Sequence, residues 1–323
     1  MHIAKSFGLF LTFSSFFGAT AHSADIVTPD SCSVAGVVKG GGQYIGENYK
    51  DSSGLSRSIT PWESAFGEAA LSYECNGLGA QVDGAFYQHW ANYSGSPSFN
   101  LNNGNGHIGG ALFWRNAEMA AFGIGASRIF QNNSASLPFG GGPFGGPTGK
   151  WRIGGFGEFY ASDSLTFGAG AYYVTGQTYL ANAIFDQFGF EGDLYAKFYA
   201  TDNIGLTLRG DAFSASWQFP AVKFADWRGY ALSAEAEYLF PGTTVSTFLG
   251  ARLADRTRAA LPGSGYYTLD ETVAYAGVRF DFGGAAQSSL RARDRHGPFD
   301  NTSVFEEKVP THGAEESNFI LTP

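Results

Sequence analysis

Apolar and polar residues alternate with a period of two through most of this chain. In residues 188–198 the even positions are apolar or glycine, whereas Glu191, Asp193 and Lys197 occupy odd positions. Successive side chains of a strand point to opposite faces, so this spacing collects the charges on one face. A helix would spread the same charges around its axis. The segment therefore predicts a β-strand with one apolar and one polar face.

Short turn signals rich in Asn, Asp, Gly, Pro and Ser separate these alternating segments about every 40 residues. They lie at residues 75–77, 115–117, 162–164, 201–203 and 241–243. Longer connections alternate with them, at residues 46–61, 94–105, 132–150, 179–186, 219–228 and 258–268. The strands between these connections are expected at 34–45, 62–75, 78–93, 106–115, 118–131, 151–161, 164–178, 187–200, 203–218, 229–240, 243–257 and 269–282.

This pattern predicts an all-β fold, namely a transmembrane antiparallel up-and-down β-barrel of about twelve strands, with ten or fourteen as alternatives. Short turns at one end and long loops at the other are typical of outer-membrane barrels, whose turns are periplasmic and whose loops are extracellular. Composition favours the same class, because only 15% of residues are charged, against about 25% in soluble domains. A secreted β-sandwich or propeller is the alternative, but it would not need an apolar face on nearly every strand.

The two ends of the chain do not follow the strand pattern. Lys5 precedes an apolar stretch at residues 7–17 that is too short to span a bilayer, so residues 1–23 are predicted to be a signal peptide. The barrel is expected over residues 24–283. Residues 284–323 mix charges without a period and are expected to form a disordered periplasmic tail. Two alternatives for the tail are a plug folded back into the lumen and a contact with the cell wall.

The last predicted strand ends in the sequence Tyr-Ala-Gly-Val-Arg-Phe-Asp-Phe, residues 275–282. It resembles the β-signal of bacterial outer-membrane proteins, which Tyr275, Gly277, Phe280 and Phe282 would provide here. The resemblance implies recognition by the barrel-assembly machinery and places the chain among porin-like outer-membrane β-barrels, without identifying a subfamily. About 40 residues follow the signal, whereas in the family it lies at the extreme C-terminus.

The two cysteines are predicted to meet. Cys32 precedes the first strand and Cys75 ends the second, so both lie at the same end of neighbouring strands, in an oxidising compartment. We expect a disulfide. No His lies near either thiol in the sequence, which disfavours a metal site.

If the apolar faces contact lipid, the polar faces line a lumen. The residues assigned to it are Lys39, Glu68, Glu74, Asp83, His89, His107, Arg152, Glu158, Glu191, Asp193, Lys197, Arg209, Asp211, Glu235, Glu237, Arg252, Arg256, Arg279 and Asp281. Either they line a narrow water-filled passage, or they pair across the lumen and block it. Inward glycines leave room, which favours the passage. Trp62, Trp90, Trp151 and Trp227 are expected in the aromatic girdle at the extracellular strand ends, and Tyr73, Trp114, Tyr238 and Phe240 at the periplasmic ends.

The leading functional prediction is passive diffusion of small hydrophilic solutes or ions through this lumen, with outer-membrane lipids around the barrel. The alternative is a closed structural or surface-interaction barrel. A lipid hydrolase is a third candidate, but it needs Ser and His on the lipid face, and parity turns His89 and His107 inward. No enzymatic activity, cofactor or metal is expected. A formal net charge of −9 disfavours nucleic-acid binding, and the oligomeric state is left open.

Overall fold

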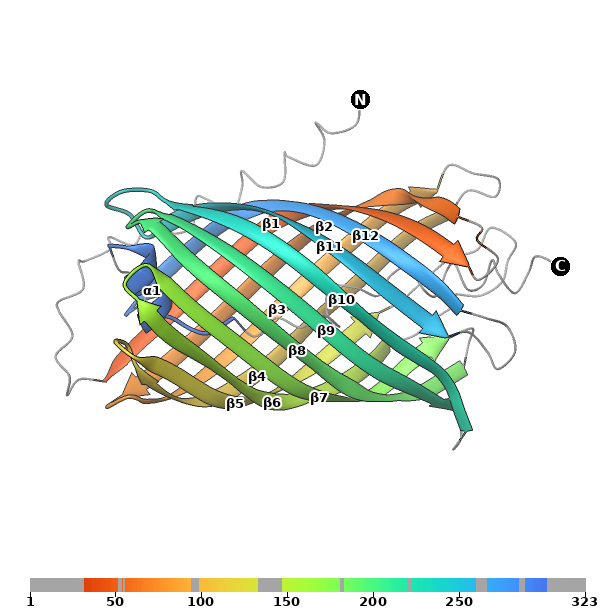
Figure 1. Cartoon of the computed structure of the whole chain (residues 1–323), viewed down its shortest axis with the longest axis horizontal. Coiled ribbons are helices and arrows are strands. Elements are labelled where there is room, and N and C mark those ends of the chain that lie inside the picture. The colour runs from red at the N-terminus through yellow and green to blue at the C-terminus, as the bar shows by residue number, and fades with distance from the viewer. Residues whose placement is uncertain are drawn as a thin grey trace, which may run out of the picture.

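The computed structural model describes residues 32–51, 54, 56–93, 99–132, 147–180, 183–219, 222–259, 266–284 and 288–300. Its strands are β1 (Ser33–Asp51), β2 (Ser56–Cys75), β3 (Leu78–Tyr93), β4 (Phe99–Asn116), β5 (Ala120–Asn132), β6 (Pro147–Ser162), β7 (Leu165–Leu180), β8 (Ala183–Thr201), β9 (Ile204–Phe219), β10 (Val222–Leu239), β11 (Val245–Ala259) and β12 (Tyr266–Gly283). Each pairs antiparallel with the next, and β1 pairs with β12 to close the barrel (Figure 1). The prediction of a twelve-stranded up-and-down barrel is confirmed. The predicted signal peptide lies outside the described residues.

All five predicted tight turns join consecutive strands at one end of the barrel, which we call the turn end. Between β2 and β3, Asn76 and Gly77 have φ angles of 53° and 79°, as a two-residue hairpin turn requires. The opposite end, which we call the loop end, has shorter connections than the sequence pattern indicates, because the strands run further. β1 and β2, for example, enclose only residues 52–55. Alternation of apolar and polar residues marks only the part of a strand that has one apolar face. Backbone pairing continues beyond it through polar residues such as Glu47, which lies opposite Glu271.

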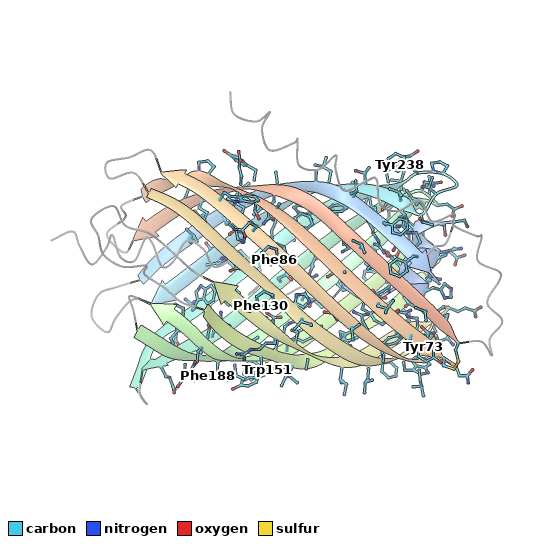
Figure 2. The ribbon with its side chains drawn as sticks, turned by 180° about the vertical axis from the view of Figure 1, so that it is seen from behind. Tyr73, Phe86, Phe130, Trp151, Phe188 and Tyr238 are labelled. Carbon is cyan, nitrogen blue, oxygen red and sulfur yellow. A yellow bond between two sulfur atoms is a disulfide. The ribbon has the colours of Figure 1, made fainter. Side chains whose placement is uncertain are left out.

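The outer surface is apolar, with exposed Val, Leu, Ile and Phe side chains on the barrel wall, among them Val82, Ile108, Leu194 and Leu232. Tyr73 and Tyr238 lie toward the turn end, and Phe130 and Trp151 toward the loop end (Figure 2). A surface of this kind suits the acyl chains of a bilayer. Among the described residues, no helix is long and apolar enough to cross a membrane.

The expectation that Trp227 lies in the extracellular aromatic girdle is wrong. The predicted strand starts at residue 229, but β10 begins at Val222, so Trp227 follows the inward and outward alternation of this strand. Its side chain shares the inner face with Glu235 and is only 3% exposed. It packs inside the barrel, with its ring 4.6 Å from that of Phe213.

Two contacts fix β1 to its neighbouring strands at the turn end. A disulfide joins Cys32 to Cys75, as predicted, and links the start of β1 to the end of β2. On the outer face Phe280 and Phe282 stack with their rings 6.2 Å apart, and the Phe282 ring lies over Gly36 of β1. The predicted assembly signal therefore sits on the closing strand, while its recognition by the assembly machinery stays a prediction.

The expectation of a disordered tail is wrong for residues 288–300. β12 ends at Gly283 in the left-handed conformation (φ 65°), and Gly284 donates a backbone hydrogen bond to the Val34 carbonyl. The helix α1 (Leu290–His296) follows and lies within the turn end of the barrel (Figure 1). Its charged side chains have partners on the barrel wall, which composition alone does not reveal. Residues 285–287 and 301–323 lie outside the described part of the chain.

Candidate functional site

The inner wall carries the residues assigned to the lumen from parity. The cross-strand register places each of them in rows that face the interior, for example Lys39 opposite both Glu68 and Arg279. His89, His107 and Arg152 are buried there, at 0%, 5% and 4% exposure. The structure therefore brings the predicted polar residues together on one continuous inner surface.

Most charges on this wall are paired with other wall residues. The pairs are Lys39–Glu68 (3.3 Å), His107–Asp83 (2.8 Å), Arg115–Glu74 (3.1 Å), Arg152–Glu191, Lys197–Glu158 (3.6 Å), Arg209–Asp211 (2.9 Å), Arg209–Asp193 (3.6 Å), Arg252–Glu271 (3.1 Å), Arg256–Glu271 (2.9 Å), Arg279–Asp281 (3.0 Å) and Arg279–Glu237 (3.6 Å). In each of these pairs the two partners lie on the same strand, on neighbouring strands, or on two strands that have one other strand between them. The pairs therefore run along the wall and do not bridge the lumen.

A cavity of about 210 Å³ lies between these walls, in the interior of the barrel. Its lining combines charged groups such as Glu68, Arg209 and Glu235 with the aromatic side chains of Tyr87 and Tyr275. The hydroxyl of Tyr87 donates a 2.9 Å hydrogen bond to Glu68, so the ring is held against the wall. Such a lining can solvate ions and small polar molecules by exchanging water for fixed polar groups.

Toward the loop end the inner wall carries an apolar cluster that sequence reasoning missed. Ile129, Val174, Phe213, Trp217 and Trp227 pack together there and are buried. The signal was available, because Phe213 and Trp217 share the parity of Asp211 and Arg209 on β9. The lumen is therefore polar in its centre and partly apolar toward the loop end.

Residues 288–300, which we call the plug, cover the turn end of the lumen (Figure 1). The Ser289 hydroxyl caps α1 by accepting a hydrogen bond from the Ala292 amide, and the Gly297 amide donates to the Arg293 carbonyl at the other end. Leu290 packs against Tyr199 and Leu239 of the wall. Sequence reasoning missed this helix, although Ser289 and the Gly297-Pro298 pair are typical start and stop signals.

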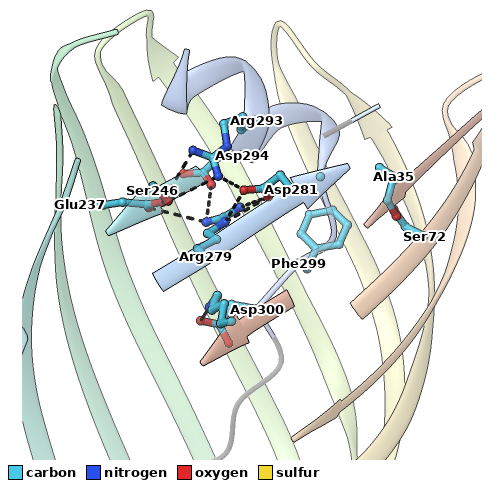
Figure 3. Close-up of polar contacts among 12 residues, drawn as sticks. Ala35, Ser72, Glu237, Ser246, Arg279, Asp281, Arg293, Asp294, Phe299 and Asp300 are labelled. Atoms are coloured by element: carbon cyan, nitrogen blue, oxygen red, sulfur yellow. Dashed lines mark hydrogen bonds and ion pairs between the residues drawn. The ribbon is translucent and has the colours of Figure 1, made fainter. Parts of the chain in front are cut away.

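Two adjacent charged residues of α1 bind the wall from inside (Figure 3). Arg293 is fully buried; its guanidinium pairs with Asp281 and donates a 3.4 Å hydrogen bond to Ser246. Asp294 lies 3.5 Å from both Lys197 and Arg279. Together they connect the helix with β8, β11 and β12.

The environment of Asp294 fixes its charge. Burial on its own raises the pKa of this carboxyl group, but Lys197, Arg279 and a 2.8 Å hydrogen bond from the Tyr199 hydroxyl oppose it. The net effect lowers the pKa of Asp294 to about 2. The carboxylate is therefore negatively charged at any physiological pH and holds its cationic partners.

The tip of the plug contacts the opposite wall. Gln81 exchanges two hydrogen bonds with the backbone of Phe299, at 2.8 and 2.9 Å. Arg115 donates to the Gly297 carbonyl at 2.7 Å and stacks on the Phe299 ring. Asp300 extends toward the cavity, 3.6 Å from Lys39. Contacts on β1, β3 and β4 are thus added to those on β8, β11 and β12, so the plug spans the lumen.

The described residues contain no group of three His, Cys, Asp or Glu side chains suited to a metal ion. His89 faces Asn105 at 3.4 Å and His107 faces Asp83, both inside the barrel.

No protein-family model and no curated protein matches this sequence. Solved outer-membrane barrels align with its structure. The COG4313 outer membrane channel from Pseudomonas putida F1 aligns with a TM-score of 0.50 and 11% identity, over 80% of this chain and 100% of the channel. The translocator domain of the autotransporter NalP from Neisseria meningitidis gives 0.48 and 10%, over 86% and 96%. The KdgM porin in complex with oligogalacturonate gives 0.39 and 9%, over 75% and 99%.

The chain thus resembles outer-membrane β-barrel channels and porins as a class. At these identities the likeness is one of fold, and no subfamily or solute follows from it.

Proposed function

We propose that this protein is an outer-membrane channel for small hydrophilic solutes or ions. The observation that carries the proposal is the direction of the ion pairs on the inner wall. Because Lys39, Arg209 and Arg279 pair with residues of their own or nearby strands, the charges of the wall are neutralised without ion pairs that cross the lumen. A central cavity lined by both signs of charge remains. Barrels of this size lie between small filled barrels and wide porins.

The proposal includes the setting of the channel. Export would be directed by residues 1–23, and insertion by recognition of Tyr275, Gly277, Phe280 and Phe282 by the assembly machinery. The turn end would face the periplasm, as short turns do in outer-membrane barrels. The start of β1 and the end of β12 lie at this end. The apolar outer surface supports the placement in lipid.

A closed structural barrel is the second candidate, and the plug is the observation that favours it. Arg293 is buried against the wall and Phe299 is held by Gln81, so the plug covers the turn end of the lumen. The two candidates differ in whether this arrangement is permanent. Lipid hydrolysis has less support, because His89 and His107 both lie inside and not on the outer face.

Planar-bilayer recording on the refolded full-length protein tests the proposal. We expect discrete current steps in potassium chloride at voltages of either sign. A full-length protein and an Arg293→Gln variant that both insert as folded barrels and yet carry no current at any voltage would support the closed barrel instead.

A further inference from the structure

The plug is attached to the barrel mainly by polar contacts. Of its side chains, Leu290 and Phe299 are the buried apolar ones, at 3% and 7% exposure. The other anchors are polar and include the ion pairs of Arg293 and Asp294, the pair between Asp300 and Lys39, and hydrogen bonds to Gln81 and Arg115. At the neighbouring turns Arg295 donates to the Ser162 carbonyl at 2.6 Å, and the Leu290 amide donates to the Asp202 carbonyl at 2.8 Å. An intact buried ion pair gives little net stability, because each charge is also well solvated in water, although removing only one partner is strongly destabilising. Such an interface releases more easily than an apolar one.

The charged wall groups that hold the plug keep partners of their own. Arg279 retains Asp281 and Glu237, so neither its charge nor that of Asp281 is left alone when Arg293 and Asp294 leave. The same holds for Lys39 with Glu68 and for Lys197 with Glu158.

The wall residues that contact the tip of the plug, Arg115 and Gln81, also keep partners on the wall. Arg115 pairs with Glu74 at 3.1 Å, and Gln81 donates to Asp83 at 3.2 Å. The charged groups of the wall therefore have a partner with the plug in place and also without it. A structural core segment, in contrast, leaves unpaired buried groups behind when it is removed.

We propose that residues 288–300 form a releasable plug that gates the lumen, with Arg293 as its main polar anchor. This inference rests on the proposed channel function. In the docked state the helix α1 blocks the turn end. In the released state the plug charges are hydrated and the wall pairs remain, so the cavity between Lys39 and Glu235 connects with the turn-end solvent.

Thiol labelling of the full-length protein tests whether the plug moves. Ser289 is buried, and Cys is close to it in size. Since this change removes the hydroxyl that caps α1, every labelling rate is compared within the Ser289→Cys background. Because Cys32 and Cys75 are joined in a disulfide, Ser289→Cys adds the single free thiol. A water-soluble maleimide should label this thiol slowly in the docked state. Adding Arg293→Gln should raise the labelling rate about tenfold or more, because a buried charge pair is lost from the docked state alone.

The matched control is Arg291→Gln. Arg291 belongs to the same helix and pairs at 3.0 Å with Asp163, whose side chain is 85% exposed in a turn. Removing this charge should leave the labelling rate within about twofold, since exposed pairs contribute little. Arg293→Lys keeps the charge and should label more slowly than Arg293→Gln. If Arg293→Gln does not fold, Asp294→Asn takes its place with the same expectation.

Equal labelling rates for Arg293→Gln and Arg291→Gln would overturn the releasable plug. Bilayer currents separate this failure from a failure of the channel function. Faster labelling without any current in Arg293→Gln would retain a mobile plug and reject the channel. A third outcome is that the unmodified protein carries current, and that Arg293→Gln increases neither the current nor the labelling rate. This outcome would retain the channel and reject the gate.

Discussion

Asp294 shows how a single carboxylate fixes the position of the plug. Lys197 and Arg279 approach it from β8 and β12, and the Tyr199 hydroxyl donates a hydrogen bond to it. These partners outweigh the cost of burial and lower the pKa of Asp294 from 3.8 to about 2. A group whose pKa is lowered in the docked state contributes stability above its ordinary pKa and loses it as the pH falls through the lowered value.

The contribution of Asp294 to the free energy of docking should therefore be constant from pH 8 to about 5. It should decrease as the pH falls from about 4 toward 2. Asp294→Asn should weaken docking at pH 7 by about 2 kcal/mol and remove this part of the pH dependence. Hydrogen-exchange protection of the Phe299 amide, which donates to Gln81, measures both effects.

The control for this series is Arg291→Gln, which removes one exposed ion pair of the same helix and should leave the Phe299 protection unchanged. Protection in Asp294→Asn equal to that of the unmodified protein at pH 7 would contradict the role assigned to this carboxylate.

At the scale of the elements, the seam between β1, β2 and β12 closes the barrel. The Cys32–Cys75 disulfide joins residues separated by 43 positions and ties the start of β1 to β2. On its other side β1 pairs with β12, the strand that carries Phe280 and Phe282.

Replacing both cysteines by serine should lower the free energy of unfolding by about 3–4 kcal/mol, because the disulfide restricts the unfolded chain over a long loop. Urea titration of the refolded barrel measures the change, with the reduced unmodified protein as the control. The two should have the same midpoint. Serine variants as stable as the oxidised protein would show that the disulfide does not stabilise the barrel.

The elements also show how far the sequence leads. Alternation located all twelve strands, and the turn residues located the tight turns, because both depend on local chemistry. Strand ends such as residues 46–51 were not recoverable, since backbone pairing outside the lipid needs no apolar face. The plug helix was missed for a different reason. Arg293 and Asp294 resemble a solvated pair until the opposite wall supplies Asp281, Arg279 and Lys197.

At the scale of the whole molecule, a polar inner surface is enclosed by an apolar outer one. Parity predicted which side chains face inward, because it depends only on the strand period. Which strands the ion pairs join could not be predicted from parity, because it depends on the register between strands. This pairing along the wall leaves Glu235 at the central cavity, whereas Glu237 also approaches Arg293 of the plug at 3.9 Å.

Ion preference should depend on Glu235. Glu235→Gln removes an ionisable carboxyl group from the cavity lining and, in a salt gradient at alkaline pH, should shift the reversal potential toward weaker cation preference. Glu118→Gln, a charge loss in the exposed turn after β4, is the matched control and should have no effect. An unchanged reversal potential in Glu235→Gln would place the passage of ions elsewhere.

The most direct test of a plugged channel compares bilayer currents of the full-length protein with those of a chain that ends at Gly284. The shortened chain keeps every strand, the disulfide and the wall ion pairs, and so should refold as a closed barrel. We predict frequent, long openings for the shortened chain and rarer, shorter ones for the full-length protein, with the same cation preference. Equal currents from the two chains, or silence from both once they are inserted as folded barrels, would contradict the account.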